Sequence, residues 1–162
     1  MAADSAEGPV PSETSLESVH TPTFTEILAS AGISICITTY QAGKVIIARE
    51  ADGVTNTHFR AFQKPMGLVA TADRLVLGTA GQIWDFRNVP SAAKRIEPQG
   101  SHTGCYMPRV TYTTGDIDVH EMALVDRDIV FVNTRFSCLC RINTDYSFEP
   151  IWRPNFISAY DP

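Results

Sequence analysis

The chain has 162 residues, of which 44% are hydrophobic, so it has the size and apolar content of one ordinary globular domain. Its formal net charge of -5 argues against a nucleic-acid-binding surface, because phosphate binding depends on clustered Lys and Arg and the basic residues here are scattered singly. No segment has the length and apolar character of a membrane span, and the amino terminus lacks the basic and apolar regions of a secretory signal. We therefore expect a cytoplasmic protein without nucleic-acid or membrane partners.

Residues 1–20 are rich in Ser, Glu, Ala and Pro and contain few large apolar side chains. Such a segment buries too little surface to offset the entropy of ordering, so we expect a disordered tail followed by one domain over residues 21–162. The domain begins with TPTFTEILASAG, which predicts a short helix over residues 24–31. Thr23 is the expected N-cap, Glu26 its capping-box partner and Gly32 the residue that ends the helix.

Beyond Gly32 the helical period disappears, and short runs of Ile, Val, Phe and Thr alternate with turn residues, which predicts an all-β chain. Three segments share one design of strand, polar turn and strand, and each predicts a hairpin: ICITTYQAGKVIIAR (35–49), LVLGTAGQIWDFR (75–87) and IVFVNTRFSCLCRI (129–142). The last two extend backward by one more strand and an Asp-Arg turn, over residues 66–79 and 122–134.

A repeat of this kind, recurring about every 40 to 55 residues, is typical of β-propeller blades. Closed propellers typically need about four to eight blades, and this chain has room for about three. The sequence therefore predicts an incomplete propeller, with a β-sandwich as the alternative. An open stack of blades exposes apolar surface at its carboxyl end, so we expect self-association or pairing with a missing carboxyl-terminal half.

Five strings support a family resemblance: TTYQAGK (38–44), KPMGL (64–68), TGDIDVHEMAL (114–124), VNTRFSCL (132–139) and SFEPIWRPNFIS (147–158). In this order they resemble the amino-terminal half of an uncharacterised family of bacterial conserved hypothetical proteins. That family is known as a domain of unknown function, and its members look like β-propellers. The resemblance implies a fold and a family, and it implies no activity.

The most chemically suggestive stretch is DIDVHE, residues 116–121. If it is a strand, alternation places Asp116, Asp118 and His120 on one face and Glu121 on the other, with Ile117 and Val119. The three polar side chains could bind a divalent cation, or Asp118, His120 and Glu121 could act as acid and base groups. The structural alternative, which we favour, is that these residues bond turn amides and neighbouring carbonyls.

Two arginines near this stretch, Arg109 and Arg135, are expected to pair with its carboxylates or to receive an anionic ligand, and pairing is favoured. Phe148, Trp152 and Phe156 are expected to pack in the core or between blades.

Four cysteines, Cys36, Cys105, Cys138 and Cys140, are expected to be reduced thiols, because no export signal accompanies them. Cys138 and Cys140 lie two positions apart without a second matching pair, which favours buried thiols over a zinc site.

Two functions follow from this pattern. The chain is either a scaffold module that binds a protein or ligand, or a metal-assisted hydrolase or lyase that uses Asp116, Asp118 and His120. The scaffold is favoured because no nucleophile and base of recognised spacing occur, and fold alone does not imply function.

Overall fold

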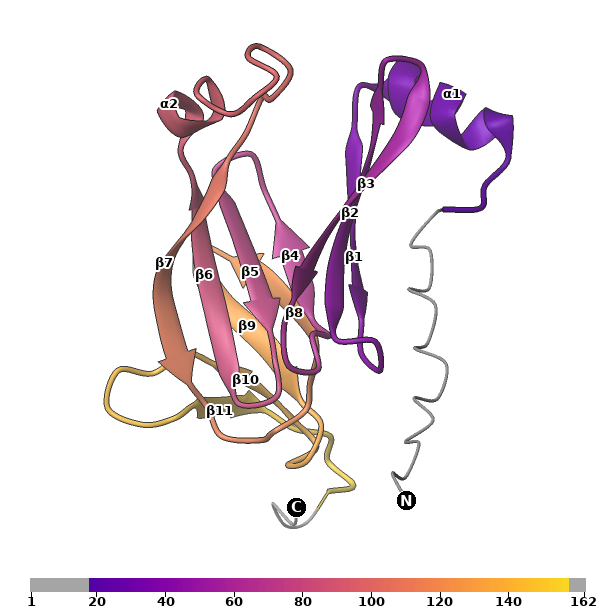
Figure 1. Cartoon of the computed structure of the whole chain (residues 1–162). Helices are drawn as coiled ribbons and strands as arrows, with labels where there is room; N and C mark the ends of the chain where they lie inside the picture. Colours follow the sequence, from indigo (N-terminus) through magenta and orange to yellow (C-terminus); the bar gives the residue numbers. More distant parts are fainter. Residues whose placement is uncertain (1–17, 158–162) are drawn as a thin grey trace, which may run out of the picture.

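The computed structural model describes residues 18–157, and within them the chain forms three antiparallel sheets whose strands follow one another in sequence order (Figure 1). The first sheet contains β1 (Ser34–Thr39), β2 (Lys44–Ala51) and β3 (Val54–Ala61). The second contains β4 (Leu68–Ala70), β5 (Arg74–Gly78), β6 (Gln82–Asn88) and β7 (Tyr106–Thr113). The third contains β8 (Val119–Val125), β9 (Asp128–Asn133), β10 (Cys138–Arg141) and β11 (Glu149–Trp152).

This architecture confirms the all-β prediction and the three predicted hairpins, which are β1–β2, β5–β6 and β9–β10. The backward extensions are confirmed as β4–β5 and β8–β9. No sheet closes on itself, so the propeller arrangement stays a prediction. Most of the expected tail, residues 1–17, lies outside the described residues, and residues 18–20 are exposed coil.

The helix α1 (Pro22–Ala31) begins two residues earlier than predicted. Thr21 is the N-cap residue and Pro22 takes the first helical position, where its missing N–H costs no hydrogen bond. The predicted N-cap at Thr23 is therefore wrong, and no side chain caps this end. Gly32 ends the helix in the left-handed conformation with φ 61°, as predicted. A second, four-residue helix that was not predicted, α2 (Pro90–Ala93), lies in the connection between β6 and β7.

The turns show which strands of the three sheets are equivalent. In the hairpin β1–β2 the hydroxyl of Thr39 donates to the carbonyl of Lys44 at 2.9 Å, and in β5–β6 the hydroxyl of Thr79 donates to the carbonyl of Gln82 at 2.9 Å. Asn133, which pairs with Cys138, closes the hairpin β9–β10 at the position equivalent to Thr39 and Thr79. By this equivalence β1 corresponds to β5 and β9, so the first sheet lacks a counterpart of β4 and β8.

Aromatic side chains join the first sheet to the second. Phe62, which follows β3, packs edge-on against Trp84 and Phe86 of β6, with ring centroids 5.8 and 6.3 Å apart. The hydroxyl of Thr38 on β1 also donates to the carbonyl of Met66 at 2.7 Å. These contacts hold the first sheet beside the second (Figure 1).

The opposite face of the second sheet packs on the third and forms the main core. Its buried members are Val76, Ile83, Ile117, Val119, Met122, Ile129, Phe131, Cys138 and Cys140. Gly78 permits the closest approach, because a Cβ at this position would lie 2.8 Å from Cγ1 of Val119. Leu77 lies two residues before Thr79, which closes the hairpin β5–β6, and it faces the first sheet. Phe131 lies two residues before Asn133, which closes the hairpin β9–β10, and it faces the second sheet. The sheets therefore stack in one direction.

A buried ion pair lies at the interface between the second and third sheets. The guanidinium of Arg74 donates to both carboxylate oxygens of Asp85, at 3.0 and 2.9 Å, and donates through Nη1 to the carbonyl of Arg127 at 2.6 Å. Arg74 and Asp85 are only 8% and 1% exposed. Hydrogen bonds to the Asp85 carboxylate raise the pKa of Arg74 above its ordinary value. The cation is thus held charged, and it ties β5 to the β8–β9 turn.

Removing one member of this pair should be costly. We expect Asp85→Ala to lower the free energy of unfolding by about 3–5 kcal/mol, because it leaves a buried guanidinium without its counterion. Urea denaturation followed by circular dichroism measures this loss. Arg141→Ala, which breaks the exposed ion pair with Glu149, serves as the control and should change stability little. Equal losses in the two variants would contradict the account.

Candidate functional site

The acidic stretch predicted as a site precedes β8 instead of forming its first residues. Asp116 and Asp118 lie in the connection between β7 and β8, and Asp118 has a left-handed backbone with φ 50°. The alternation predicted for this stretch holds up to Val119, because Ile117 and Val119 are 3% and 1% exposed while Asp116 is exposed and Asp118 is half-buried. Burial of the two apolar residues in the core turns both carboxylates toward solvent.

At His120 the alternation fails because β8 contains a bulge between Val119 and Met122. His120 and Glu121 are both exposed, so the prediction that Glu121 faces the same side as Ile117 and Val119 is wrong. The bulge has a structural partner, since the amide of Gly67 donates to the carbonyl of Val119 at 2.9 Å. A Cβ at Gly67 would lie 3.0 Å from that oxygen, so this approach of β4 to β8 depends on glycine.

Arg135 forms ion pairs with both carboxylates of the stretch. Its Nη2 lies 2.8 Å from Oδ2 of Asp116, and its Nε lies 3.4 Å from Oδ2 of Asp118. The backbone closes the same connection, because the amide of Thr134 donates to the carbonyl of Asp118 at 3.3 Å. The predicted pairing of Arg135 with the acidic residues is therefore confirmed. The three side chains are between 27% and 48% exposed, so the pair holds the connection at the surface and contributes little stability.

The residues that were candidates for a cation site do not come together as one. Within residues 18–157, no group of three or more His, Cys, Asp and Glu side chains could hold a metal ion. Arg135 lies against both carboxylates, where a divalent cation would meet a positive charge. The other candidate cation, Arg109, is exposed on β7, and no ion pair or hydrogen bond among the described side chains links it to Asp116, Asp118 or Arg135.

The thiols of Cys138 and Cys140 lie side by side in the core, with their Sγ atoms 3.5 Å apart. They are 3% and 0% exposed, and all four cysteines are free, as predicted. Burial and, to a smaller extent, the neighbouring thiol of Cys138 raise the pKa of Cys140 to about 12. The Nδ2 atom of Asn133 has no hydrogen-bond partner although it is buried, and its Oδ1 accepts from the amide of Phe136 at 3.1 Å. This part of the core is closed to solvent.

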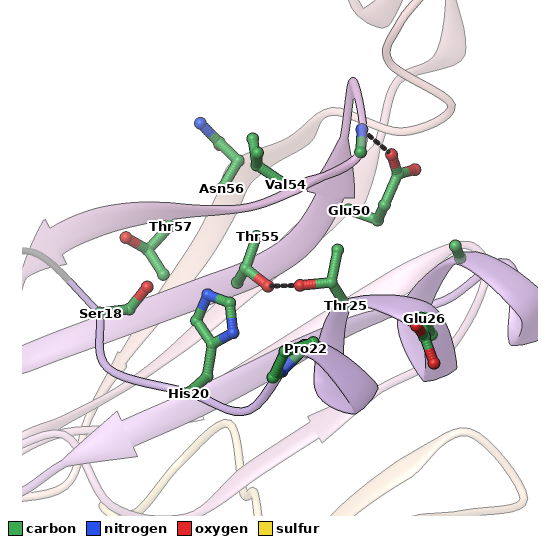
Figure 2. A pocket seen from close by; sticks show the side chains of 12 residues that line it. Ser18, His20, Pro22, Thr25, Glu26, Glu50, Val54, Thr55, Asn56 and Thr57 are labelled. Carbon is green, nitrogen blue, oxygen red and sulfur yellow. Dashed lines mark hydrogen bonds between the residues drawn. The ribbon is translucent and has the colours of Figure 1, made fainter.

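A polar groove lies between the start of α1 and the edge of β3 (Figure 2). It has a volume of about 890 Å³, and His20, Glu26, Glu50 and Asn56 are among its lining residues. Its walls are joined by a hydrogen bond of 2.7 Å between the hydroxyls of Thr25 and Thr55. The groove is shallow and open, and it contains no group whose chemistry points to a particular ligand.

The side of the third sheet that faces away from the second sheet carries an apolar surface. We call it the outer face and define it by residues that share this side through cross-strand pairing: Ala123, Val125, Val130, Val132, Leu139 and Trp152. Trp152 and Val125 are 57% and 51% exposed. The aromatic prediction is thus confirmed for Phe148, which packs against the core, and wrong for Trp152 and Phe156, which are exposed.

The outer face was not predicted residue by residue, although the sequence carries a signal for it. Val76 and Val130 occupy equivalent positions, each three residues before the residue that closes its hairpin, Thr79 or Asn133. Val76 is completely buried by the third sheet, whereas Val130 remains partly exposed because no described sheet covers it. Strand β9 is apolar at four successive positions, which is typical of a strand intended for burial on both faces.

Comparison with known proteins identifies a family. The family model that describes a domain of unknown function, DUF4915, matches residues 22–162. No curated protein and no solved structure matches the chain. No helix in the described part of the chain is long and apolar enough to cross a membrane.

The surface position of His120 leads to a prediction about stability. We expect His120→Ala to change the free energy of unfolding by less than about 0.5 kcal/mol, because an exposed side chain in a bulge contributes little packing. Thermal and urea denaturation measure the change. A loss as large as that expected for a buried core residue would show that His120 holds the bulge in place.

The buried thiols lead to a second prediction. In the native protein Cys138 and Cys140 should react with an aromatic disulfide reagent only at the rate of unfolding, because both sulfur atoms are inaccessible and burial raises the pKa of Cys140. Cys36 and Cys105, which are half-buried, serve as internal references. Mass spectrometry of labelled peptides separates the sites. Labelling of Cys140 as fast as Cys105 would contradict the buried position.

Proposed function

The chain belongs to the DUF4915 family, and from its geometry we propose that it is a protein-binding scaffold, an incomplete β-propeller whose outer face binds further β-sheets. The observation that carries this proposal is the exposure of an apolar sheet face at a position that is covered in the preceding sheet. Exposed apolar patches on soluble proteins commonly mark interaction sites.

The direction of stacking favours a partner that presents a β-sheet to the outer face. The first sheet packs on the second, and the second packs on the third, through equivalent faces. A fourth sheet placed on the outer face would continue the same arrangement, as in the blades of a propeller. The partner is then a polypeptide that presents a β-sheet, such as another copy of the chain.

Charged groups on the outer face support a specific mode of docking. Arg141 occupies the position that corresponds to Asp85 in the second sheet, and it forms an exposed ion pair with Glu149 at 2.8 Å. In the second sheet, the equivalent residue Asp85 is buried by the third sheet and is bonded to Arg74. By analogy, we expect the Arg141–Glu149 pair to be covered by the partner and to fix its orientation.

The alternative function, a metal-assisted hydrolase or lyase, has less support. It requires Asp116, Asp118 and His120 to act together, whereas Arg135 contacts both carboxylates and His120 lies beyond them in the bulge. A divalent cation as cofactor has no donor cluster among the described residues.

The proposal predicts concentration-dependent association of the purified chain. In the absence of its partner, the outer face should draw copies together, and Trp152→Lys or Val125→Lys should weaken this association by at least about tenfold in Kd, because a charge on the buried contact must be desolvated. Sedimentation velocity over a range of concentrations measures the effect.

The matched control is Val54→Lys. Val54 is 61% exposed and adjoins a two-residue turn, as Val125 does, but it lies on the first sheet. This variant should associate like the unchanged chain. A stable monomer at all concentrations, or equal weakening by all three variants, would contradict binding through the outer face.

A further inference from the structure

The free edge of β1 is a second unfilled position, at the opposite end of the stack from the outer face. The first sheet has three strands in the order β1-β2-β3, and β1 lies at its edge. The equivalent strands β5 and β9 are internal, because β4 and β8 pair with them on that side. The helix α1 precedes β1 where the other sheets have a strand.

Hydrogen-bond geometry shows which groups of β1 face the free side. The two-residue turn with positive φ at Asp52 and Gly53 makes Ala51 and Val54 a hydrogen-bonded pair, so alternate residues of β2 from Val45 to Ala51 bond β3. The intervening residues of β2 bond Ile35, Ile37 and Thr39 of β1. The backbone groups of the remaining β1 residues, Ser34, Cys36 and Thr38, therefore point away from the sheet.

These edge groups have no backbone partner among residues 18–157. An unpaired row of N–H and C=O groups is a template for strand addition unless the edge is protected by charges, proline or a bulge. The segment SICITT has no charge, no proline and no register shift in its pairing with β2. Four of its six residues are β-branched, which suits them to a sheet interior.

Of the other edge strands, the outer ones, β3, β7 and β11, carry the protection that β1 lacks, whereas the inner ones, β4 and β8, contact each other. Edge strand β3 contains His58 and Arg60. Edge strand β7 contains Pro108 and Arg109 and pairs with β6 through a bulge. Edge strand β11 contains Glu149 and Pro150, also with a bulge. The absence of these devices on β1 indicates that this edge is covered in the functional protein.

We propose that β1 accepts an antiparallel strand from a partner polypeptide, and that this strand has the uncharged, apolar character of the pairing segments of β4 and β8. The pairing segments of those strands, LVA in β4 and MALV in β8, define the chemistry of the occupant. The added strand gives the first sheet the same four strands as the other two. Ile33 and Ile37, 50% and 42% exposed, supply apolar surface beside it.

This inference goes beyond the proposed function, because it concerns the opposite end of the stack and a different kind of contact. Backbone hydrogen bonds supply the affinity of an added strand, whereas side-chain packing supplies that of the outer face. Substitutions on the outer face leave the β1 edge unchanged, so the two proposals can fail separately.

The test uses the full chain carrying an additional strand, copied from residues 66–71, on its amino terminus through a flexible Gly/Ser linker. Tethering raises the effective concentration of the strand to about the millimolar range. Amide hydrogen exchange by NMR is then compared between this fusion and the unchanged chain at low concentration. We expect exchange at Ser34, Cys36 and Thr38 to slow by about tenfold or more, because these amides gain hydrogen-bond partners.

Three control variants separate strand addition from general stabilisation. A fusion with proline at the position copied from Leu68 should give no protection. Cys36→Pro in the receiving strand should remove protection at Ser34 and Thr38, whereas Thr57→Pro, on the free side of β3, should retain it. Circular dichroism establishes that each variant is folded.

Three results would overturn the proposal. The first is identical exchange with and without the tethered strand. The second is slow exchange of these amides in the dilute, unchanged chain, which would show that the chain covers its own edge. The third is protection that grows with the concentration of the unchanged chain, which would make a second copy the occupant.

Discussion

The buried ion pair between Arg74 and Asp85 is the interaction on which the arrangement of the sheets depends. Two charges on adjacent strands are removed from water, and their hydrogen bonds are complete only because the β8–β9 turn supplies the carbonyl of Arg127. Such a pair is costly unless its geometry is satisfied. The third sheet must therefore lie over this face of the second, and in this position its own opposite side is turned outward.

Both ends of the stack are incomplete. At one end the outer face exposes Trp152 and Val125, and at the other the edge of β1 has unpaired backbone groups. Both features are positions that a neighbouring element occupies elsewhere in this chain. A scaffold that is completed by a protein partner accounts for both, whereas a catalytic role for the Asp116 connection accounts for neither.

Local sequence signals predicted the hairpins because strand alternation and polar turns act over a few residues. The pairing of Arg135 with Asp116 was also favoured from the sequence, since Arg135 is one of the cations nearest the acidic stretch. The bulge at His120 was not predictable, because it depends on the approach of Gly67, which immediately precedes β4. The helix began at Pro22 because proline fits the first helical turn, a preference that the Thr23 prediction overlooked.

Long-range features could not be predicted from the sequence, because they also depend on contacts between residues far apart in the chain. Nothing near Arg74 in sequence shows that it meets Asp85 and the carbonyl of Arg127, and the Asp-Arg turn predicted only a change of direction. The exposed outer face became evident only when Val130 could be compared with Val76, its buried equivalent.

The central claim is that the sheets stack in one direction and leave the outer face of the third uncovered. Tryptophan fluorescence tests it directly, because the sequence contains two tryptophans, Trp84 between the first two sheets and Trp152 on the outer face. In the Trp84→Phe variant at high dilution, acrylamide should quench Trp152 almost as efficiently as it quenches free tryptophan. A monomeric, folded chain in which Trp152 is shielded from acrylamide would show that another part of the chain covers this face, and the open stack would be wrong.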